Sequence, residues 1–329
     1  MNIVALAGGV GGARLADGLA QCLSLHPAPA LSPSLQNLTR ESSSLTVIVN
    51  TGDDFDLWGL RVCPDLDTVM YTLAGVANAQ TGWGIEGDTF ETLEMLKQLG
   101  QDTWFRVGDR DLAIDLRRTL LLREGQRLTQ VTELLCQSLG MKPNTRVLPM
   151  SDTAVATLVE TDEGTLAFQD YFVRRAWQPV IHHIRFQGIE RARLSMQVQS
   201  ALDHADLVVV CPSNPFVSID PILSVADLRD QLRGQRAVAV SPIIGGQAVK
   251  GPAAKMFREM GQEPTALAVA QHYADWLDGF VIDHADATLR EDIERLNIRV
   301  LVTHTLMRDR TDRARLAREI LEFARTVPA

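Results

Sequence analysis

The stretch IVALAGGVGGARL, residues 3–15, decides the fold class of this chain. Its first five residues, Ile3–Ala7, are all apolar and have the length of a buried β-strand. A glycine loop, residues 8–12, follows directly, and apolar residues then recur at helical spacing from about Ala13 to Leu25. The stretch therefore predicts a strand, a glycine turn and a helix, a unit whose ligand site lies at the carboxyl end of the strand.

Apolar runs of strand length recur along the chain between helical patterns, which are expected near Phe90–Leu99, Asp111–Leu121 and Thr129–Leu139. The further strands predicted are Leu45–Val49, Leu207–Cys211, Ala237–Val240, Phe280–Asp283 and Val300–Thr303. Continuous apolar strands that alternate with helices indicate a mostly parallel sheet covered on both faces.

After about residue 140 the alternation of strand and helix patterns gives way to short runs of β-forming residues, beginning with Arg146–Met150. We therefore expect an α/β protein with two parts. Residues 1–140 and 205–329 form a Rossmann-like, doubly wound, mostly parallel sheet. Residues 141–204 form a smaller inserted α+β subdomain rich in strands.

Composition narrows the class of protein. The 329 residues include 32 Lys and Arg and 41 Asp and Glu, a net charge of −9, and 46% are hydrophobic. This apolar content excludes intrinsic disorder, and the net negative charge without a basic run argues against a nucleic-acid partner. No apolar run is long enough for a membrane span, and the N-terminus lacks the features of a signal peptide. We expect a cytoplasmic protein whose four scattered cysteines are buried and reduced.

The glycine loop is the first candidate site. Glycines allow close backbone approach, and the N-terminus of the following helix offers free N–H groups to an anion. This indicates nucleotide binding by the residues Gly8, Gly9, Val10, Gly11, Gly12 and Arg14. No Gly-Lys-Ser/Thr follows, so the loop is not a Walker A motif, and Arg14 replaces the third glycine of the dinucleotide fingerprint. The alternative is a glycine turn with a purely structural role.

Four aspartates in two loops form the second candidate site. Asp53 and Asp54 follow the second predicted strand, and Asp65 and Asp67 open a helical pattern. Carboxylates beside a phosphate site predict a divalent cation, Mg²⁺, which takes one or two carboxylates together with phosphate oxygens. The alternatives are a helix cap for Asp65 and a plain turn for the Asp53–Asp54 pair. Two adjacent acids repel unless a cation offsets them, which favours the site.

Three further loops carry candidate ligand groups. Glycines beside the aromatic residues Trp83, Trp104 and Phe105 predict a frame for a flat aromatic ligand. The neighbouring candidates for that site are Gly84, Asp88, Thr89 and Arg106. The alternatives are core aromatics and helix caps. Two loops that follow predicted strands offer groups for a nucleotide: Ser213, Asn214, Ser241, Gly245 and Gly246. Lys250 and Lys255 come next and could reach phosphates, although each alone is typical of a solvated surface lysine.

Eight motifs occur in a fixed order along the chain: GGVGGARL, NTGDD, CPDLDTVMYTLAG, GWGIEGDTF, GDRDLA, PMSDT, PSNPFVSIDPIL and SPIIGG. Together they resemble the 2-phospho-L-lactate transferases of deazaflavin coenzyme F-420 biosynthesis, over about residues 3–260. The resemblance implies a Mg²⁺-dependent transfer of a phosphorylated three-carbon acid from its guanylyl diester to a ribityl hydroxyl of the deazaflavin Fo, with release of GMP. It also implies a homodimer.

The resemblance further implies roles for individual residues. Asp67 and Arg106 match deazaflavin-binding positions, and Asp53 and Asp67 match cation-binding acids, with Asp54 and Asp65 as neighbours. Asp53 or Asp54 is the expected general base, while the GGVGG, PSNP and SPIIGG loops hold the guanylyl half. Whether the acid is phospholactate, phosphoenolpyruvate or phosphoglycerate stays open.

One stretch departs from the family pattern, the Pro- and Ser-rich segment His26–Ser44, which has the character of a peripheral insertion. Two other functions compete. A nucleotide-sugar-binding regulator resembling the gluconeogenesis factor shares the glycine loop and an NT-x-DD turn, but the PDLD and GDRD segments favour the transferase. A nicotinamide-dependent dehydrogenase is disfavoured because no complete GxGxxG is present.

Overall fold

A computed structural model describes residues 1–24 and 43–328 of the chain. The predicted insertion at His26–Ser44 therefore lies almost wholly outside the described residues. Among the helices that are described, none combines the length and the apolar composition that a transmembrane segment needs. All four cysteines are buried and unpaired, as expected from their apolar surroundings.

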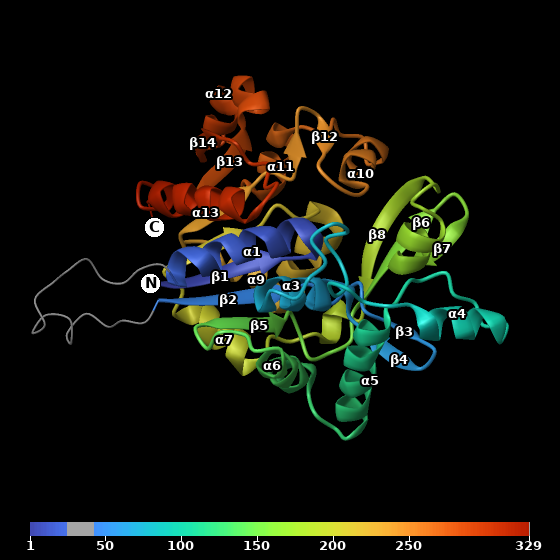
Figure 1. Ribbon diagram of the computed structural model, residues 1–329. Coiled ribbons are helices and arrows are strands. Elements are labelled where there is room, and N and C mark those ends of the chain that lie inside the picture. The colour runs from blue at the N-terminus through green and yellow to red at the C-terminus, as the bar shows by residue number, and fades with distance from the viewer. Residues whose placement is uncertain (25–42, 329) are drawn as a thin grey trace, which may run out of the picture.

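A seven-stranded, wholly parallel sheet forms the centre of the molecule (Figure 1). In spatial order its strands are β14 (Arg299–Thr303), β13 (Gly279–Asp283), β10 (Ala237–Val240), β9 (Leu207–Val210), β1 (Asn2–Ala7), β2 (Ser44–Val49) and β5 (Thr145–Pro149). The structure thus confirms the predicted Rossmann-like, doubly wound sheet.

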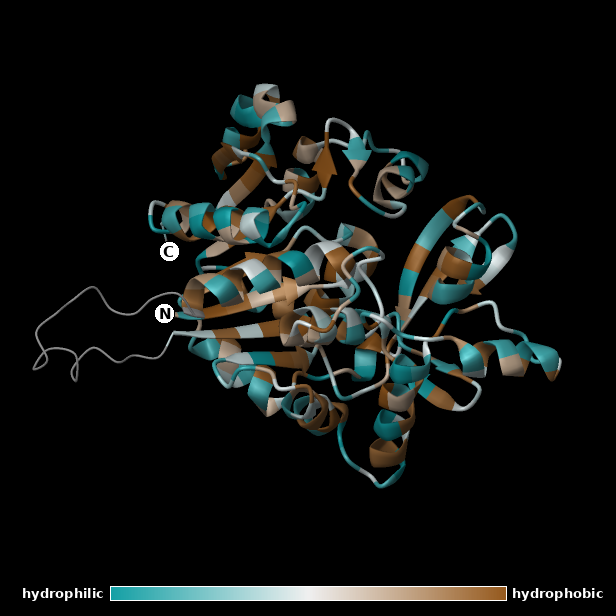
Figure 2. Ribbon diagram, viewed as in Figure 1, coloured by the Kyte–Doolittle hydropathy of each residue, from teal (hydrophilic) through white to brown (hydrophobic). Residues whose placement is uncertain are grey.

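Alternate residues of each strand supply two separate hydrophobic cores, one on each face of the sheet. Ile3 and Ala5 belong to one core, whereas Val4 and Leu6 belong to the other. The first face is covered by α1 (Gly9–Ser24), α3 (Pro64–Ala74), α6 (Leu128–Ser138) and α13 (Arg310–Ala324). The second is covered by α7 (Met196–Asp203), α8 (Asp220–Leu223), α9 (Leu228–Gln231), α10 (Ala253–Glu259), α11 (Ala266–Tyr273) and α12 (Arg290–Glu294). Strands buried on both faces read as continuous apolar runs, which Figure 2 shows as mainly brown ribbons.

Strand β5 corrects one expectation. The run Arg146–Met150 was predicted in the smaller subdomain, but β5 pairs with β2 at the edge of the large sheet. Its buried residues Val147 and Leu148 face the two opposite cores, so the run is a sheet strand like the others. The smaller antiparallel sheet contains only β7 (Gly164–Ala167), β6 (Ala156–Thr161) and β8 (Ile181–Gln187). The division into domains at residues 140 and 205 stays a prediction.

Smaller elements gather beyond the carboxyl ends of the parallel strands (Figure 1). They are the hairpin β3 (Phe55–Leu57) and β4 (Leu60–Val62), the hairpin β11 (Ile243–Ile244) and β12 (Gln247–Ala248), and the helices α4 (Glu91–Gln98) and α5 (Asp109–Arg123). The bounds of α4, α5 and α6 match their predicted spans within a few residues.

The order of the strands creates a switch point. From β1 the chain proceeds to β2 on one side, and it later returns to place β9 on the other side of β1. The loops after β1 and β9 therefore diverge and leave a crevice between them, the usual ligand position in such sheets.

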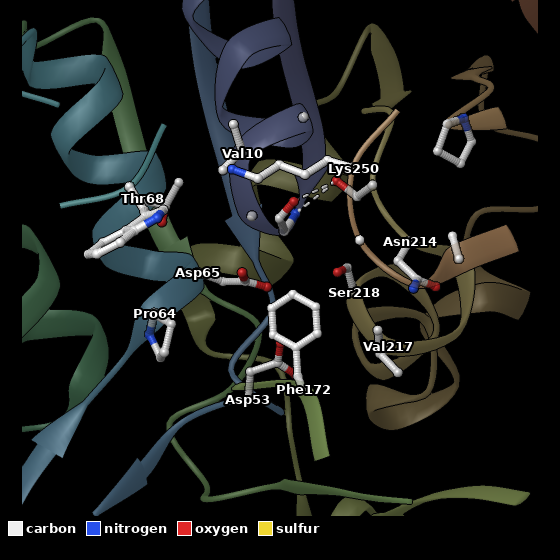
Figure 3. Close-up of a pocket in the computed structure, with 18 of the residues that line it drawn as sticks. Val10, Asp53, Pro64, Asp65, Thr68, Phe172, Asn214, Val217, Ser218 and Lys250 are labelled. Atoms are coloured by element: carbon white, nitrogen blue, oxygen red, sulfur yellow. Dashed lines mark hydrogen bonds between the residues drawn. The ribbon is translucent and has the colours of Figure 1, made fainter. Parts of the chain in front are cut away.

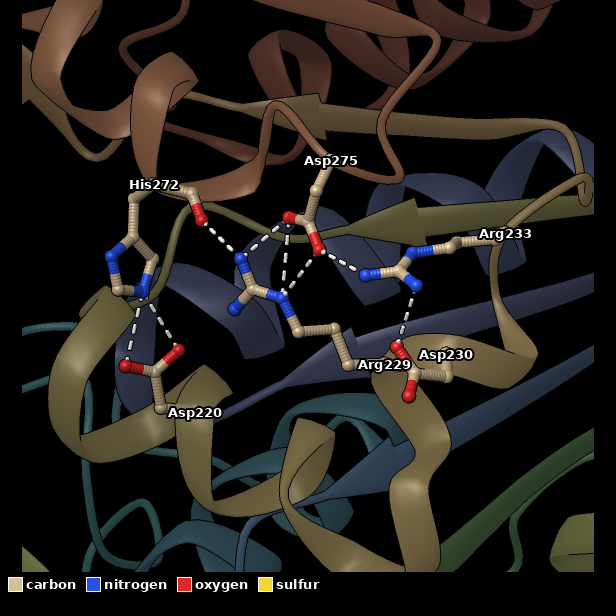
Figure 4. Close-up of polar contacts among 6 residues, drawn as sticks. All are labelled: Asp220, Arg229, Asp230, Arg233, His272 and Asp275. Atoms are coloured by element: carbon tan, nitrogen blue, oxygen red, sulfur yellow. Dashed lines mark hydrogen bonds and ion pairs between the residues drawn. The ribbon is translucent and has the colours of Figure 1, made fainter.

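A surface network joins the segment after β9 to the end of α11 (Figure 4). His272 contacts the Asp220 carboxylate through Nε2 at 2.8 Å, and Arg229 donates to Asp275 and to the carbonyl of His272. Arg233 adds a second donor to Asp275. None of these residues lines the cavity described below.

Close packing of α1 on α13 generates a prediction about Gly18. A Cβ built there would lie 2.2 Å from the carbonyl oxygen of Arg313. Ala ordinarily stabilises a helix over Gly by about 1 kcal/mol, so only crowding reverses the sign. We expect Gly18→Ala to lower the free energy of unfolding by about 1–3 kcal/mol, measured by urea denaturation.

Gly100→Ala is the control for this prediction. Gly100 has φ +82° but open space around it, so the variant loses only about 1 kcal/mol through backbone strain. A more stable Gly18→Ala protein would contradict the close contact of α1 with α13.

Candidate active site

A cavity of about 550 Å³ opens at the switch point, lined by loops that follow β1, β2, β9, β10 and β14 (Figure 3). The structure brings together in its lining the predicted residues Gly8, Gly9, Val10, Gly11, Arg14, Asp53, Asp65, Asp67, Trp83, Gly84, Arg106, Ser213, Asn214 and Ser241. It does not place Gly12, Asp54, Asp88, Thr89, Gly245 or Gly246 in that lining.

The glycine loop is tied directly to the loop after β9. The Gly8 N–H donates to Ser213 Oγ at 3.1 Å, and Ser213 Oγ donates back to the Gly8 carbonyl at 2.8 Å. A Cβ on Gly11 would lie 2.3 Å from the Pro212 carbonyl oxygen. Only glycine allows this approach, so the loop has a structural role whatever it binds. Helix α1 begins at Gly9, earlier than the predicted Ala13, because these glycines already form its first turn.

Asp65 occupies the N-terminus of α1. Its carboxylate accepts a hydrogen bond from Asn50 Nδ2 at 3.0 Å and another from the Gly9 N–H. It does not cap its own helix α3, whose N-cap residue is Cys63, so the helix-cap alternative is wrong. Burial raises the pKa of Asp65 to about 6, and these two hydrogen bonds partly offset that effect.

Asp53 lies next to Asp65 and faces the same space (Figure 3). Burial, and then the charge of Asp65, raise the pKa of Asp53 well above its usual value. Asp53 Oδ1 is buried without a hydrogen-bond partner in the described part of the chain. Two adjacent buried carboxyls, one with an unpaired oxygen, fit a bound cation, which would offset their repulsion. The described side chains alone, however, place no group of three or more His, Cys, Asp or Glu residues around one metal position.

Asp67 and Asp54 form a separate cluster around Arg118, a residue that sequence analysis missed. Arg118 on α5 is 1% exposed and forms ion pairs with Asp67 and with Asp115, the latter at 2.6 Å. Asp54 is partly buried beside Cys63, and desolvation of its carboxyl raises its pKa to about 8. Its position outside the cavity lining gives no support to the predicted roles of Asp54 as cation ligand or base.

A signal for Arg118 exists in the sequence. Asp111, Asp115 and Arg118 follow one another at spacings of four and three residues, which places them on one face of a helix. A polar stripe on the buried face predicts an internal ion-pair network. Arg117, two residues after Asp115, falls on another face of the helix and is exposed.

Asp111 is a fourth acid in the cavity lining. It accepts a hydrogen bond of 2.5 Å from the Tyr71 hydroxyl. Burial, and then the charge of Asp67, raise the pKa of Asp111 to about 7. The cavity therefore carries more carboxyl groups than the single buried arginine neutralises.

Aromatic residues form the opposite wall. Trp83 is 37% exposed and lines the cavity together with Trp104 and Phe105, which contact each other with ring centroids 5.6 Å apart. The Arg106 guanidinium lies over the ring of Phe90 at 4.5 Å. This wall offers flat apolar surface with one cation at its edge.

Asp88 and Thr89 support helices rather than the cavity. Asp88 accepts hydrogen bonds from the N–H groups of Arg110 and Asp111, which lie in the first turn of α5. Thr89 donates to Asp109 Oδ2 at 2.6 Å. The helix-cap alternative is therefore confirmed for Asp88, which caps the N-terminus of α5.

The loops after β9 and β10, which were predicted to bind a nucleotide, are stabilised by hydrogen bonds of their own residues. Asn214 Oδ1 accepts from the N–H of Phe216, and Ser241 Oγ donates to the carbonyl of Ile243, so both side chains also stabilise their own turns. The Gly245 N–H donates to the buried Asp286. Gly245 thus packs behind the loop, away from the cavity.

The buried Arg118 network generates a stability prediction. Arg118→Met leaves Asp67 and Asp115 without their cation, and removal of one partner of a buried ion pair costs about 3–5 kcal/mol. We expect a loss of that size in urea denaturation, partly recovered in the double variant Asp115→Asn/Arg118→Met. The exposed Arg117→Met is the matched control, with a change within about 0.5 kcal/mol. Equal effects of Arg117→Met and Arg118→Met would contradict the network.

Comparison with solved structures shows the same fold elsewhere. A crystal structure of a UPF0052-family protein from Bacillus halodurans superimposes with a TM-score of 0.60 over 97% of this chain and 98% of that protein. The sequences are 14% identical, so this likeness concerns the fold alone.

Comparison with protein sequences shows a closer relationship. The 2-phospho-L-lactate transferase of Methanopyrus kandleri is 42% identical over 291 residues, 88% of this chain and 93% of the relative. The phosphoenolpyruvate transferase of Thermobifida fusca is 45% identical over 293 residues, 87% of this chain and 88% of the relative. Residues 3–320 match the family described as 2-phospho-L-lactate transferase CofD. The chain belongs to this CofD family of transferases, which confirms the resemblance seen in its motifs.

Proposed function

We propose that the protein transfers a phosphorylated three-carbon acid from its guanylyl diester to a ribityl hydroxyl of the deazaflavin Fo, with release of GMP, in coenzyme F-420 biosynthesis. The observation that carries this proposal is the single cavity that combines an aromatic wall, a buried carboxylate pair and the glycine turn of α1. Membership of the CofD family supports the reaction class.

Two substrates divide the cavity in this proposal. The deazaflavin ring lies against Trp83 and Phe105 with Arg106 at its edge, and the guanylyl group lies beyond β9 and β10, near Ser213 and Ser241. The ribityl hydroxyl then reaches the carboxylates at the N-terminus of α1. Its oxygen attacks the phosphorus that bears the acid, the bond from that phosphorus to the bridging oxygen breaks, and GMP leaves with the bond electrons.

Asp53 is the proposed acceptor of the hydroxyl proton. It lines the cavity, whereas Asp54 does not, and its Oδ1 has no partner among the described residues. Asp53 and Asp65 are the proposed protein ligands of Mg²⁺, which would neutralise charge on the diphosphate, while Asp67 is held by Arg118 beside them. Phosphoryl transfer depends mainly on such positioning and charge neutralisation.

A direct assay tests the function and identifies the acid. Relatives carry two names, 2-phospho-L-lactate transferase and phosphoenolpyruvate transferase, so the acid is decided by experiment. Purified protein, Mg²⁺ and Fo are mixed with guanylylated phospholactate, phosphoenolpyruvate or phosphoglycerate. Mass spectrometry should show Fo heavier by one phospho-acid unit, with GMP released. Unchanged Fo in all three mixtures, together with binding of a UDP-sugar, would favour the regulator instead.

The substitution Asp53→Asn should change stability and activity in opposite directions. Asp53→Asn removes one of two buried carboxyl groups that repel each other. We therefore expect the Tm of the metal-free protein to rise, by about 2–4 °C for each kcal/mol of repulsion that is removed. We also expect the variant to lose both transfer and the Tm increase that Mg²⁺ gives to the wild type.

Asp54→Asn is the matched comparison. Its Oδ1 is likewise buried without a partner among the described residues, but Asp54 lies outside the cavity lining, so the Mg²⁺-dependent Tm increase should persist. Loss of that increase in both variants would make Asp54 a cation ligand after all.

The raised pKa values predict how Mg²⁺ binding depends on pH. The Asp65 carboxyl has a pKa of about 6, above its unfolded value, so it favours the folded state at low pH and this contribution is lost as pH rises through 6. Metal must displace any proton held there. We expect the Mg²⁺-induced Tm increase to be larger at pH 8 than at pH 5.5, measured by differential scanning fluorimetry. An increase independent of pH would contradict a site built on Asp53 and Asp65.

A further inference from the structure

Three cationic side chains line the cavity among the residues that the structure describes: Arg14, Arg106 and Lys250. Arg106 is engaged with the Phe90 ring, at the aromatic wall. Arg14 Nη1 donates to the carbonyl of Met307 at 3.0 Å. Lys250 extends across the N-terminal end of α1 and places its ammonium beside Val10 (Figure 3).

Lys250 and Arg14 both line the cavity without an anionic partner among the described residues. Neither forms an ion pair with any residue in the described part of the chain, although four carboxyl groups line the same cavity. Partial burial, and then the charge of Arg14, lower the pKa of Lys250. Two cations without anionic partners in one cavity lining favour an anionic ligand there.

The backbone of the glycine turn supplies less to an anion than its sequence indicates. The Gly8 N–H already donates to Ser213, and the Gly9 N–H already donates to the Asp65 carboxylate. With these two N–H groups engaged, a negatively charged group at this end of α1 is further stabilised by a cation from outside the turn. Lys250 is the lysine that reaches it.

The partner of Lys250 in this structure is a neutral backbone carbonyl on an exposed turn. Lys250 Nζ donates to the carbonyl of Thr81 at 2.9 Å. Thr81 belongs to the exposed turn 78–84, which contains Gly82 and Gly84 at positive φ and carries Trp83 of the aromatic wall. Gly82 packs on Val10, since a Cβ there would lie 2.8 Å from Val10 Cγ1. The lysine thus fastens this turn over the N-terminus of α1.

We propose that Lys250 exchanges the Thr81 carbonyl for a phosphate of the guanine nucleotide, so that nucleotide binding releases the 78–84 turn from α1. The inference rests on the proposed function for the identity of the nucleotide. The phosphate places a negative charge opposite the ammonium, which the neutral carbonyl of Thr81 does not, and this added attraction favours the exchange.

Calorimetric titration of the full chain tests the contact. The titrants are GDP and guanosine, and the variants are Lys250→Met, Lys250→Arg and the control Lys255→Met. Lys255 lies five residues further along, with its ammonium on Glu259 at 2.7 Å. We expect Lys250→Met to weaken GDP binding about tenfold or more and to leave guanosine binding unchanged. Lys250→Arg should retain most of the GDP affinity, and Lys255→Met all of it.

Hydrogen exchange tests the release of the turn. The N–H groups of Asn78 and Gly82 are bonded within the turn, to the carbonyls of Gly84 and Asn78. GDP should speed their exchange in the wild type. In Lys250→Met exchange should be fast already, with no further effect of GDP.

Three results would overturn the inference. They are unchanged GDP affinity in Lys250→Met, an equal loss for GDP and guanosine, and no binding of GDP by the wild type. A wild type that binds GDP as described but transfers nothing to Fo would refute the proposed function and leave the role of Lys250 standing.

Discussion

The close contact between the glycine turn of α1 and the loop after β9 is the constraint on which the site depends. Ser213 Oγ bonds both the N–H and the carbonyl of Gly8, and Gly11 leaves no room for a Cβ beside Pro212. These contacts fix where α1 begins relative to the sheet. They thereby place the N-terminus of α1 next to Asp65 and Lys250, so the same glycines position an acidic and a basic group of the cavity lining.

Buried charge is the second organising feature, and it acts against the stability of the fold. Burial raises the pKa values of Asp53, Asp54, Asp65 and Asp111, because an ionised carboxyl is poorly solvated in the interior. Arg118 compensates only the part of this cluster that surrounds Asp67. Such concentrations of perturbed carboxyl groups are typical of functional sites, where a ligand supplies the missing charge.

Much of the architecture was predictable because strand and helix signals are local. Apolar runs and their spacing predicted the parallel strands, and glycines directly after the first strand predicted the position of the crevice. Strand β5 was misassigned because its run Arg146–Met150 precedes a β-rich segment, and only its pairing with β2 shows which sheet it joins. The four predicted aspartates lie in two clusters for a similar reason. Asp53 and Asp54 are adjacent in sequence, but only Asp53 lines the cavity, and the sequence does not show which of the two does so.

The sequence by itself determined the fold class, the family and the loops that face the cavity, because these depend on patterns within single segments. Tertiary structure decided how the charges are partnered. Arg118 meets Asp67 across 51 positions of the chain, and Lys250 meets Thr81 across 169. No local pattern encodes such pairs, because they arise only when separate loops converge at the carboxyl ends of the strands. The same convergence separates Asp53, which faces the cavity, from its neighbour Asp54, which does not.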